Sequence, residues 1–171
     1  MINILIILFL SININCFLDL IIIGGGNYDK GIAGIGLNYL SCFDHKNHNL
    51  NIGYYSLENF DKNLNISNIN IVDKKSSAKI KLFTYLLAVK DGNDNVIDFT
   101  DQIITSDSIN GAVSMLECSS IPYYWVSILN NKFDFVIVPD QWLVKIYEDC
   151  GVTIPIFVLD LVVDYSGLIK H

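Results

Sequence analysis

Several glycines follow directly after the apolar segment 17–23, and glycines in this position suggest binding through backbone groups. Residues 17–23 are expected to form a strand that runs into Gly24, Gly25 and Gly26, with Gly31 close behind. Glycine lets the backbone turn sharply and approach a ligand closely, and a following helix offers free N–H groups to an anion. The same pattern serves close packing of a strand against a helix, so spacing alone leaves both interpretations open.

A nicotinamide cofactor is disfavoured at this loop, because the glycines do not form a clean G-x-G-x-x-G. A dinucleotide site would also need an acidic residue at the end of a second strand about 20 positions on, to bind the ribose. The sequence offers no convincing residue there. We predict no cofactor.

Histidine and cysteine residues do not form a metal-binding pattern. His45 and His48 lie in the polar segment DHKNHN without a third ligand at suitable spacing, and a solvated loop explains them better. The four cysteines include no C-x-x-C pair, so no structural zinc is predicted. We expect small buried residues with free thiols, and one disulfide is the alternative for an exported protein.

The elements that would position these residues are best defined between Gly111 and Leu161. Residues 112–117, 133–139 and 154–161 are apolar stretches of strand length. Between them, apolar residues recur at the spacing of a buried helical face: Trp125, Ile128 and Leu129 in one stretch, and Trp142, Leu143, Ile146 and Tyr147 in the next. Both tryptophans are therefore expected in the core and not as platforms for a sugar ring. Strands this apolar, alternating with helices, predict a parallel sheet covered on both faces.

Proline and glycine residues mark the boundaries of these elements. Pro122 is expected in the first turn of a helix, where its missing N–H costs nothing. Pro139 is expected to end a strand, and Gly151 to follow the last turn of the second helix.

The segments before Gly111 have a weaker pattern. We predict a strand over 49–57, a polar loop over 58–70, a helix over 77–95, and a short element plus loop over 95–110. The helix rests on Ile80, Phe83 and Leu87, which share a helical face, and on the turn residues DGND that close it.

Composition limits the class of protein. The 171 residues suffice for one domain with a sizeable core, and the 51% of hydrophobic residues indicates a globular chain. A net charge of −7 leaves no basic stripe for phosphates, so nucleic acid is not an expected partner. We predict an α/β fold, a single Rossmann-like domain with a parallel sheet flanked by helices.

The N-terminal stretch allows two interpretations. Residues 1–16 contain an apolar run of the size of a signal-peptide core, but no Lys or Arg precedes it. They are either a signal peptide or the start of the first strand, and residues 17–171 are the domain. The localisation, cytoplasmic or exported, depends on this choice. Asn13, Asn15 and Asp19 interrupt the run, so no transmembrane span is predicted.

Several short pieces occur in a family-like order in the second half of the chain: Glu117, Pro122-Tyr123-Tyr124-Trp125, Leu129-Asn130, Phe133-Asp134, Val138-Pro139-Asp140, Gly151-Val152 and Pro155-Ile156-Phe157-Val158-Leu159. In this order they resemble the N-terminal, acceptor-side domain of GT-B glycosyltransferases of the retaining, lipopolysaccharide-transferase-like type. A looser match, Asp29-x-Gly31, lies in the glycine-rich loop. Asp160 stands where the family commonly has proline.

The resemblance implies half of a GT-B fold and transfer of a sugar from a nucleotide-sugar donor to a glycan acceptor. It implies Gly25, Gly26, Asp29 and Gly31 as substrate-binding residues. Glu117 follows a predicted strand, where ligands of open α/β sheets bind, and is the candidate catalytic carboxylate. A surface carboxylate is the alternative for Glu117.

The family binds its donor on a C-terminal domain, and the chain reaches His171 without basic residues for a diphosphate. We therefore expect a truncated product, or one half of a split enzyme whose partner chain carries the donor domain, with little activity alone. The alternative is a non-catalytic Rossmann-like module that binds a glycan or a protein.

Overall fold

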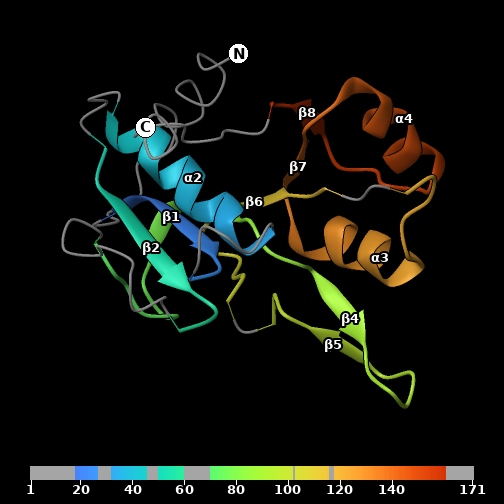
Figure 1. The fold of residues 1–171 in the computed structure, drawn as a ribbon, viewed down its shortest axis with the longest axis horizontal. Helices are drawn as coiled ribbons and strands as arrows, with labels where there is room; N and C mark the ends of the chain where they lie inside the picture. Colours follow the sequence, from blue (N-terminus) through green and yellow to red (C-terminus); the bar gives the residue numbers. More distant parts are fainter. Residues whose placement is uncertain are drawn as a thin grey trace, which may run out of the picture.

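A six-stranded sheet forms the centre of the protein (Figure 1). The computed structural model describes residues 18–26, 32–45, 50–59, 70–101, 103–115 and 118–160. Their elements are β1 (Leu18–Gly24), α2 (Ile32–His45), β2 (Ile52–Ser56), β3 (Ala78–Phe83), β4 (Ala88–Lys90), β5 (Val96–Asp98), β6 (Ile109–Val113), α3 (Tyr123–Lys132), β7 (Phe135–Val138), α4 (Gln141–Asp149) and β8 (Ile156–Val158).

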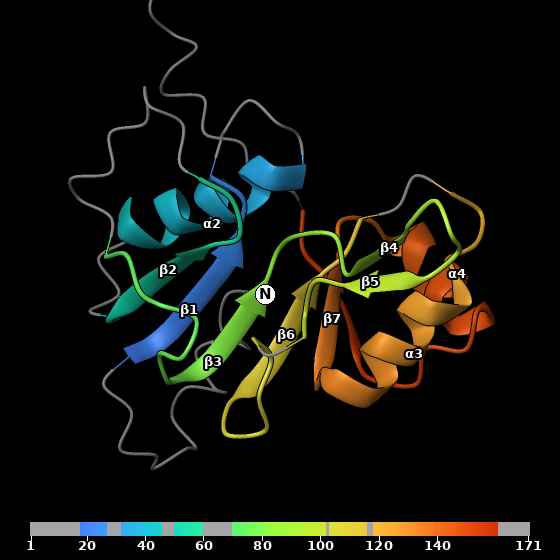
Figure 2. The ribbon, with the colours of Figure 1, turned by 90° about the horizontal axis from the view of Figure 1, so that it is seen from below.

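All neighbouring strands of this sheet are parallel, in the order β2-β1-β3-β6-β7-β8. Figure 2 shows this order from β2 to β7. The chain moves from β1 outward to β2, crosses back to β3, and then continues outward in the other direction. The winding therefore reverses between β1 and β3. The α/β, Rossmann-like fold expected from the sequence is confirmed.

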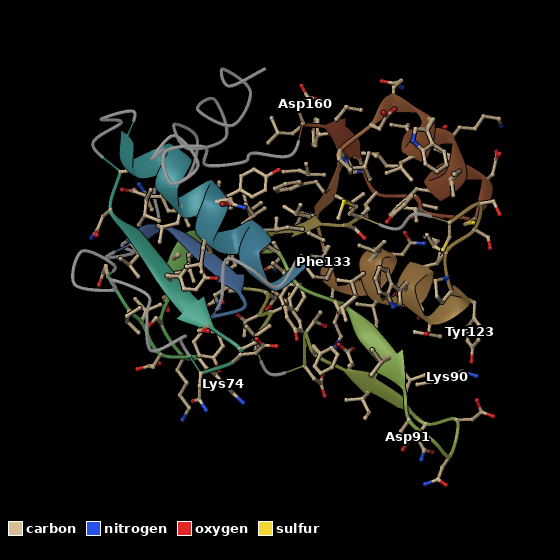
Figure 3. All side chains as sticks on the ribbon, viewed as in Figure 1. Lys74, Lys90, Asp91, Tyr123, Phe133 and Asp160 are labelled. Atoms are coloured by element: carbon tan, nitrogen blue, oxygen red, sulfur yellow. The ribbon has the colours of Figure 1, made fainter. Side chains whose placement is uncertain are left out.

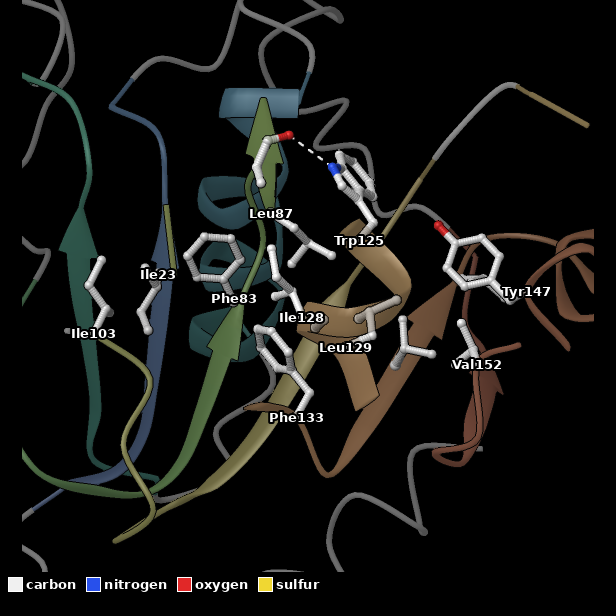
Figure 4. Close-up of a cluster of buried hydrophobic side chains, with 14 of the residues drawn as sticks. Ile23, Phe83, Leu87, Ile103, Trp125, Ile128, Leu129, Phe133, Tyr147 and Val152 are labelled. Atoms are coloured by element: carbon white, nitrogen blue, oxygen red, sulfur yellow. Dashed lines mark hydrogen bonds between the residues drawn. The ribbon is translucent and has the colours of Figure 1, made fainter. Parts of the chain in front are cut away.

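The two faces of the sheet carry separate cores, because alternate residues of a strand point to opposite faces. On β1, Leu20 and Ile22 pack with residues of α2. Ile21 and Ile23 pack on the other face, in the cluster that includes residues of α3 and α4 (Figure 4). Helices thus cover both faces, as a parallel sheet requires.

The predicted elements after Gly111 agree closely with the structure. Pro122 is the residue that precedes α3, and the predicted face of Trp125, Ile128 and Leu129 is buried. β7 ends directly before Pro139. Gly151 follows the C-cap of α4 with φ +96°, a conformation that glycine adopts without a Cβ penalty.

The prediction that Trp142 is a core residue is wrong, since 52% of its surface is exposed. The buried residues of α4 are Leu143 and Tyr147, which are spaced i, i+4. Trp142 is next to Leu143, about 100° around the helix, and so leaves this face. The Asp140 carboxylate accepts a hydrogen bond from the Trp142 N–H at 3.0 Å, which fixes the start of α4.

The predicted helix over 77–95 is also wrong, because this segment forms β3 and β4. β3 lies between β1 and β6, and all of its residues except Lys79 are buried. Ile80 and Phe83 also have helical spacing, but this spacing is a coincidence. The charged Lys81 is buried in β3, where its ammonium donates to the Ile103 carbonyl and to Thr105 Oγ1.

A β-hairpin, β4–β5, stands in the crossover from β3 to β6 where such folds usually carry a helix. Trp125 Nε1 donates to the Ala88 carbonyl at 2.8 Å, drawn as a dashed line in Figure 4. Lys132 of α3 forms ion pairs with Asp98 at 2.8 Å and with Asp101 at 2.9 Å. The hairpin is thereby attached to α3, and its turn around Asp91 points away from the sheet (Figure 3).

Candidate functional site

The edge of the sheet at the carboxyl ends of β1, β2 and β3 is the candidate functional site. All strands of the sheet are parallel, so their carboxyl ends lie on one edge. In open α/β sheets, ligands bind outside this edge where the winding reverses. Here that point lies between β1 and β3. The glycine-rich loop leaves the sheet at the same place.

Hydrogen bonds fix the start of the glycine-rich loop on its neighbour β2. The Tyr54 hydroxyl donates to the Gly25 carbonyl at 2.6 Å, and the Leu57 N–H donates to the Gly24 carbonyl at 2.8 Å. Gly25 and Gly26 are both buried. The loop therefore begins in a defined position at the reversal point.

Two glycines of this region serve close packing. A Cβ on Gly24 would lie 2.7 Å from Thr84 Oγ1 and from the Tyr54 hydroxyl, and 3.3 Å from the Gly36 Cα. A Cβ on Gly36 would lie 2.5 Å from the same Thr84 Oγ1. Glycine at both positions lets α2 approach the ends of β1 and β3. For Gly24 and Gly36 the packing interpretation is thus supported, and ligand binding by Gly25 and Gly26 stays a prediction.

Glu58 and Tyr85 form a carboxylate–phenol pair at this edge. The Tyr85 hydroxyl donates to Glu58 Oε1 at 2.6 Å, although 27 positions separate the two residues in the sequence. Glu58 follows β2 and Tyr85 follows β3, with β1 between these strands in the sheet. The hydrogen bond to Glu58, together with burial, raises the pKa of Tyr85 to about 12. The phenol therefore remains a neutral donor at physiological pH.

The surroundings hold this pair in place. The Ser56 hydroxyl donates to the Glu58 carbonyl at 2.6 Å. The ring of Tyr85 packs edge-on against Phe99, with 5.7 Å between the ring centroids. Both Glu58 and Tyr85 are partly buried.

The sequence alone did not reveal this pair. Glu58 lies in a segment expected to be a polar loop, and Tyr85 lies in the segment wrongly predicted as a helix. The position of Glu58, directly after a predicted strand, was the one signal that pointed to it.

The charge at the carboxyl edge has one sign. We define the edge residues as the described residues within three positions after each strand of the six-stranded sheet: 25–26, 57–59, 84–86, 114–115, 139–141 and 159–160. They include three carboxylates, on Glu58, Asp140 and Asp160 (the last labelled in Figure 3), and no Lys, Arg or His.

A second hydroxyl pair near this edge has a structural role. Ser114, directly after β6, and Tyr147 of α4 lie with their oxygens 2.7 Å apart, and both side chains are buried. Burial raises the pKa of Tyr147 to about 12. The two hydroxyls satisfy each other inside the core, so they do not face a ligand.

Three of the predicted site residues, Asp29, Gly31 and Glu117, lie outside the described residues, as do the N-terminal segment 1–16 and His48. Gly25 and Gly26 are described and lie at the reversal point. His45 is the last residue of α2 and not part of the following loop.

Metal ligands and membrane spans are absent from the part of the chain that the structure describes. Within it, no three His, Cys, Asp or Glu side chains gather around a common point. Cys118 and Cys150 are free thiols; Cys118 is exposed, contrary to the expectation of a buried residue. None of the described helices combines the length and the hydrophobicity needed to cross a bilayer.

Comparisons with protein-family models, with curated proteins and with solved structures find no match. The function is therefore inferred from the chemistry of the carboxyl edge, together with the sequence resemblance described above.

Proposed function

We propose that this chain is the acceptor-side domain of a GT-B-type glycosyltransferase and that it binds a glycan acceptor at the carboxyl edge between β1 and β3. The observation that carries the proposal is the convergence at the reversal point. The glycine-rich loop after β1 and the Glu58–Tyr85 pair from β2 and β3 meet there. The resemblance of the segment 114–161 to these enzymes supports the same assignment.

The side chains at this edge suit a sugar acceptor. In glycosyl transfer, an acceptor hydroxyl oxygen forms a bond to the anomeric carbon of the donor, and the bond from that carbon to the phosphate breaks. The acceptor hydroxyl passes its proton to the departing phosphate, which leaves with the nucleotide, and the transition state resembles an oxocarbenium ion that nearby carboxylates stabilise. Within this scheme Glu58 and Tyr85 orient the acceptor by hydrogen bonds to its hydroxyls. Orientation of this kind is a large part of catalysis.

Glu117 is our candidate for the carboxylate next to the reacting centre. It follows β6 by four positions in the sequence, and the carboxyl end of β6 belongs to the same edge. Its replacement by glutamine is expected to reduce transfer at least a hundredfold while acceptor binding stays within threefold.

The nucleotide-sugar donor is expected to bind outside this domain. In the enzymes that this chain resembles, the nucleotide sugar lies on a second Rossmann-like domain that faces the first. We therefore expect this domain to bind the acceptor alone, and to support transfer when such a donor domain is supplied.

The proposal is tested by isothermal titration calorimetry of the chain with a panel of oligosaccharides and with nucleotide sugars. We expect saturable binding of at least one oligosaccharide and none of the nucleotide sugars. Glu58→Gln is expected to weaken that binding. Glu148→Gln, an identical change at an exposed position near the end of α4, is expected to leave it unchanged.

Binding of a nucleotide sugar without any oligosaccharide would contradict the acceptor assignment. Oligosaccharide binding without transfer, when a donor domain and donor are added, would identify a non-catalytic glycan-binding module.

A further inference from the structure

We propose that the carboxyl edge selects uncharged glycans and rejects glycans that carry phosphate or carboxylate groups. This inference rests on the proposed function, because it specifies the acceptor of the same site. It follows from the hydrogen-bonding capacity of the Glu58–Tyr85 pair and from the charge of the edge residues.

The Glu58–Tyr85 pair can accept further hydrogen bonds but has no proton left to donate in one. The phenol proton of Tyr85 already goes to Glu58 Oε1. Glu58 Oε2 accepts no hydrogen bond from any described residue, and the phenol oxygen retains a lone pair. A ligand that pairs with these two oxygens has to donate. A sugar hydroxyl can donate, whereas a phosphate dianion or a carboxylate can only accept.

The position of the carboxylate is fixed before a ligand arrives. The Tyr85 hydroxyl holds the carboxylate, the Tyr85 ring packs against Phe99, and the Ser56 hydroxyl holds the backbone carbonyl of Glu58. A rotamer change that turns the carboxylate away from an approaching anion would break the hydrogen bond from Tyr85, so relief of the repulsion costs that bond.

The described edge residues carry carboxylates and no positive charge. The edge residues hold no Lys, Arg or His, while Asp140 and Asp160 add two further carboxylates. The formal charge of the described edge residues is therefore negative, which disfavours anionic ligands.

The test compares neutral glycans with matched charged forms. A glycan array that carries neutral oligosaccharides next to their sialylated, uronate and phosphorylated counterparts identifies the best neutral binder, and calorimetry then measures it against its charged counterpart. We expect the neutral form to bind at least tenfold more tightly. Equal or tighter binding of the charged form would overturn the charge selection and leave the proposed acceptor function standing. Absence of binding by any glycan would instead remove the proposed function.

Variants of Glu58 and Tyr85 test whether this pair causes the preference for uncharged glycans. Glu58→Gln keeps an acceptor for Tyr85 and removes the charge, so it is expected to weaken the neutral glycan at least fivefold and to narrow its advantage over the charged form. Glu148→Gln is the matched control and is expected to change neither affinity. An unchanged ratio in Glu58→Gln would overturn the role of Glu58. Should that variant lose its cooperative thermal transition, Tyr85→Phe provides the second test, with the neutral glycan weakened and the charged one unaffected.

Discussion

Replacement of Gly36 by alanine is expected to destabilise the protein by about 2 kcal/mol, although alanine is the better helix residue. Gly36 lies in α2, where the helix passes the ends of β1 and β3. The added Cβ would lie 2.5 Å from Thr84 Oγ1 and 2.9 Å from the Tyr54 hydroxyl. Both distances are shorter than any normal carbon–oxygen contact, so the helix or the strands have to shift.

Two opposing terms give the magnitude. Thr84 is fully buried and donates its hydroxyl to the Ile23 carbonyl at 2.9 Å, so it cannot move away without loss of that bond. The penalty therefore lies at the upper end of the range for overpacking, about 3 kcal/mol. Alanine returns about 1 kcal/mol through its helix propensity. The difference is the expected loss of about 2 kcal/mol.

Equilibrium unfolding in urea measures this loss, and a double-mutant cycle identifies its cause. Thr84→Ala removes the closest atom, so Gly36→Ala is expected to cost little in that background, with a coupling free energy of about 2 kcal/mol. Gly92→Ala is the control, because a Cβ there meets nothing within 4 Å, and a change below about 0.5 kcal/mol is expected. A Gly36→Ala variant as stable as the wild type, or a coupling near zero, would refute the packing interpretation.

Other positions give further tests. Trp125→Phe is expected to lower the free energy of unfolding by about 2 kcal/mol, because the buried Ala88 carbonyl loses its indole donor; a loss below about 0.5 kcal/mol in urea would contradict this anchor of the hairpin. Gly151→Ala is expected to cost about 1–2 kcal/mol from its φ of +96° alone, since the nearest atom to the new Cβ would be 3.9 Å away, and a neutral thermal melt would argue against backbone strain. The hydrogen bond from Lys79 lowers the pKa of Asp19, so its stabilisation is present above the unfolded pKa of about 3.9 and is lost as the pH falls through the lower folded pKa. Asp19→Asn is expected to flatten the pH dependence of the free energy of unfolding in that acid range. An unchanged pH dependence there would contradict the stabilising role of the Lys79–Asp19 hydrogen bond.

The second half of the fold could be predicted from the sequence because residues that act locally mark the ends of its helices and strands. Pro122, Pro139 and Gly151 act on their own backbone, and the buried face of α3 repeats at helical spacing. β3 could not be predicted in this way. Apolar and charged residues alternate in β3 only over residues 78–82, and Ile80, Phe83 and Leu87 match a helical face equally well.

The candidate site was predictable only in part. The glycine-rich loop lies at the reversal point, as its short-range pattern suggests. The sequence could not tell which glycines serve packing and which are candidates for ligand binding, because this depends on the positions of Thr84 and Tyr54. The Glu58–Tyr85 pair depends on the strand order, because it joins residues from two strands that are separated by β1. Local sequence places Glu58 directly after a strand but carries no signal that pairs it with Tyr85.

The central claim is that a glycan binds at the carboxyl edge between β1 and β3. Amide chemical-shift mapping of the isotope-labelled chain, titrated with the neutral oligosaccharide that binds best, tests this claim most directly. We expect the largest shifts at Gly25, Gly26, Glu58 and Tyr85, with the amino ends of the same strands, such as Lys79, unaffected. Shifts confined to the amino ends of the strands, or to the β4–β5 hairpin, would contradict the claim.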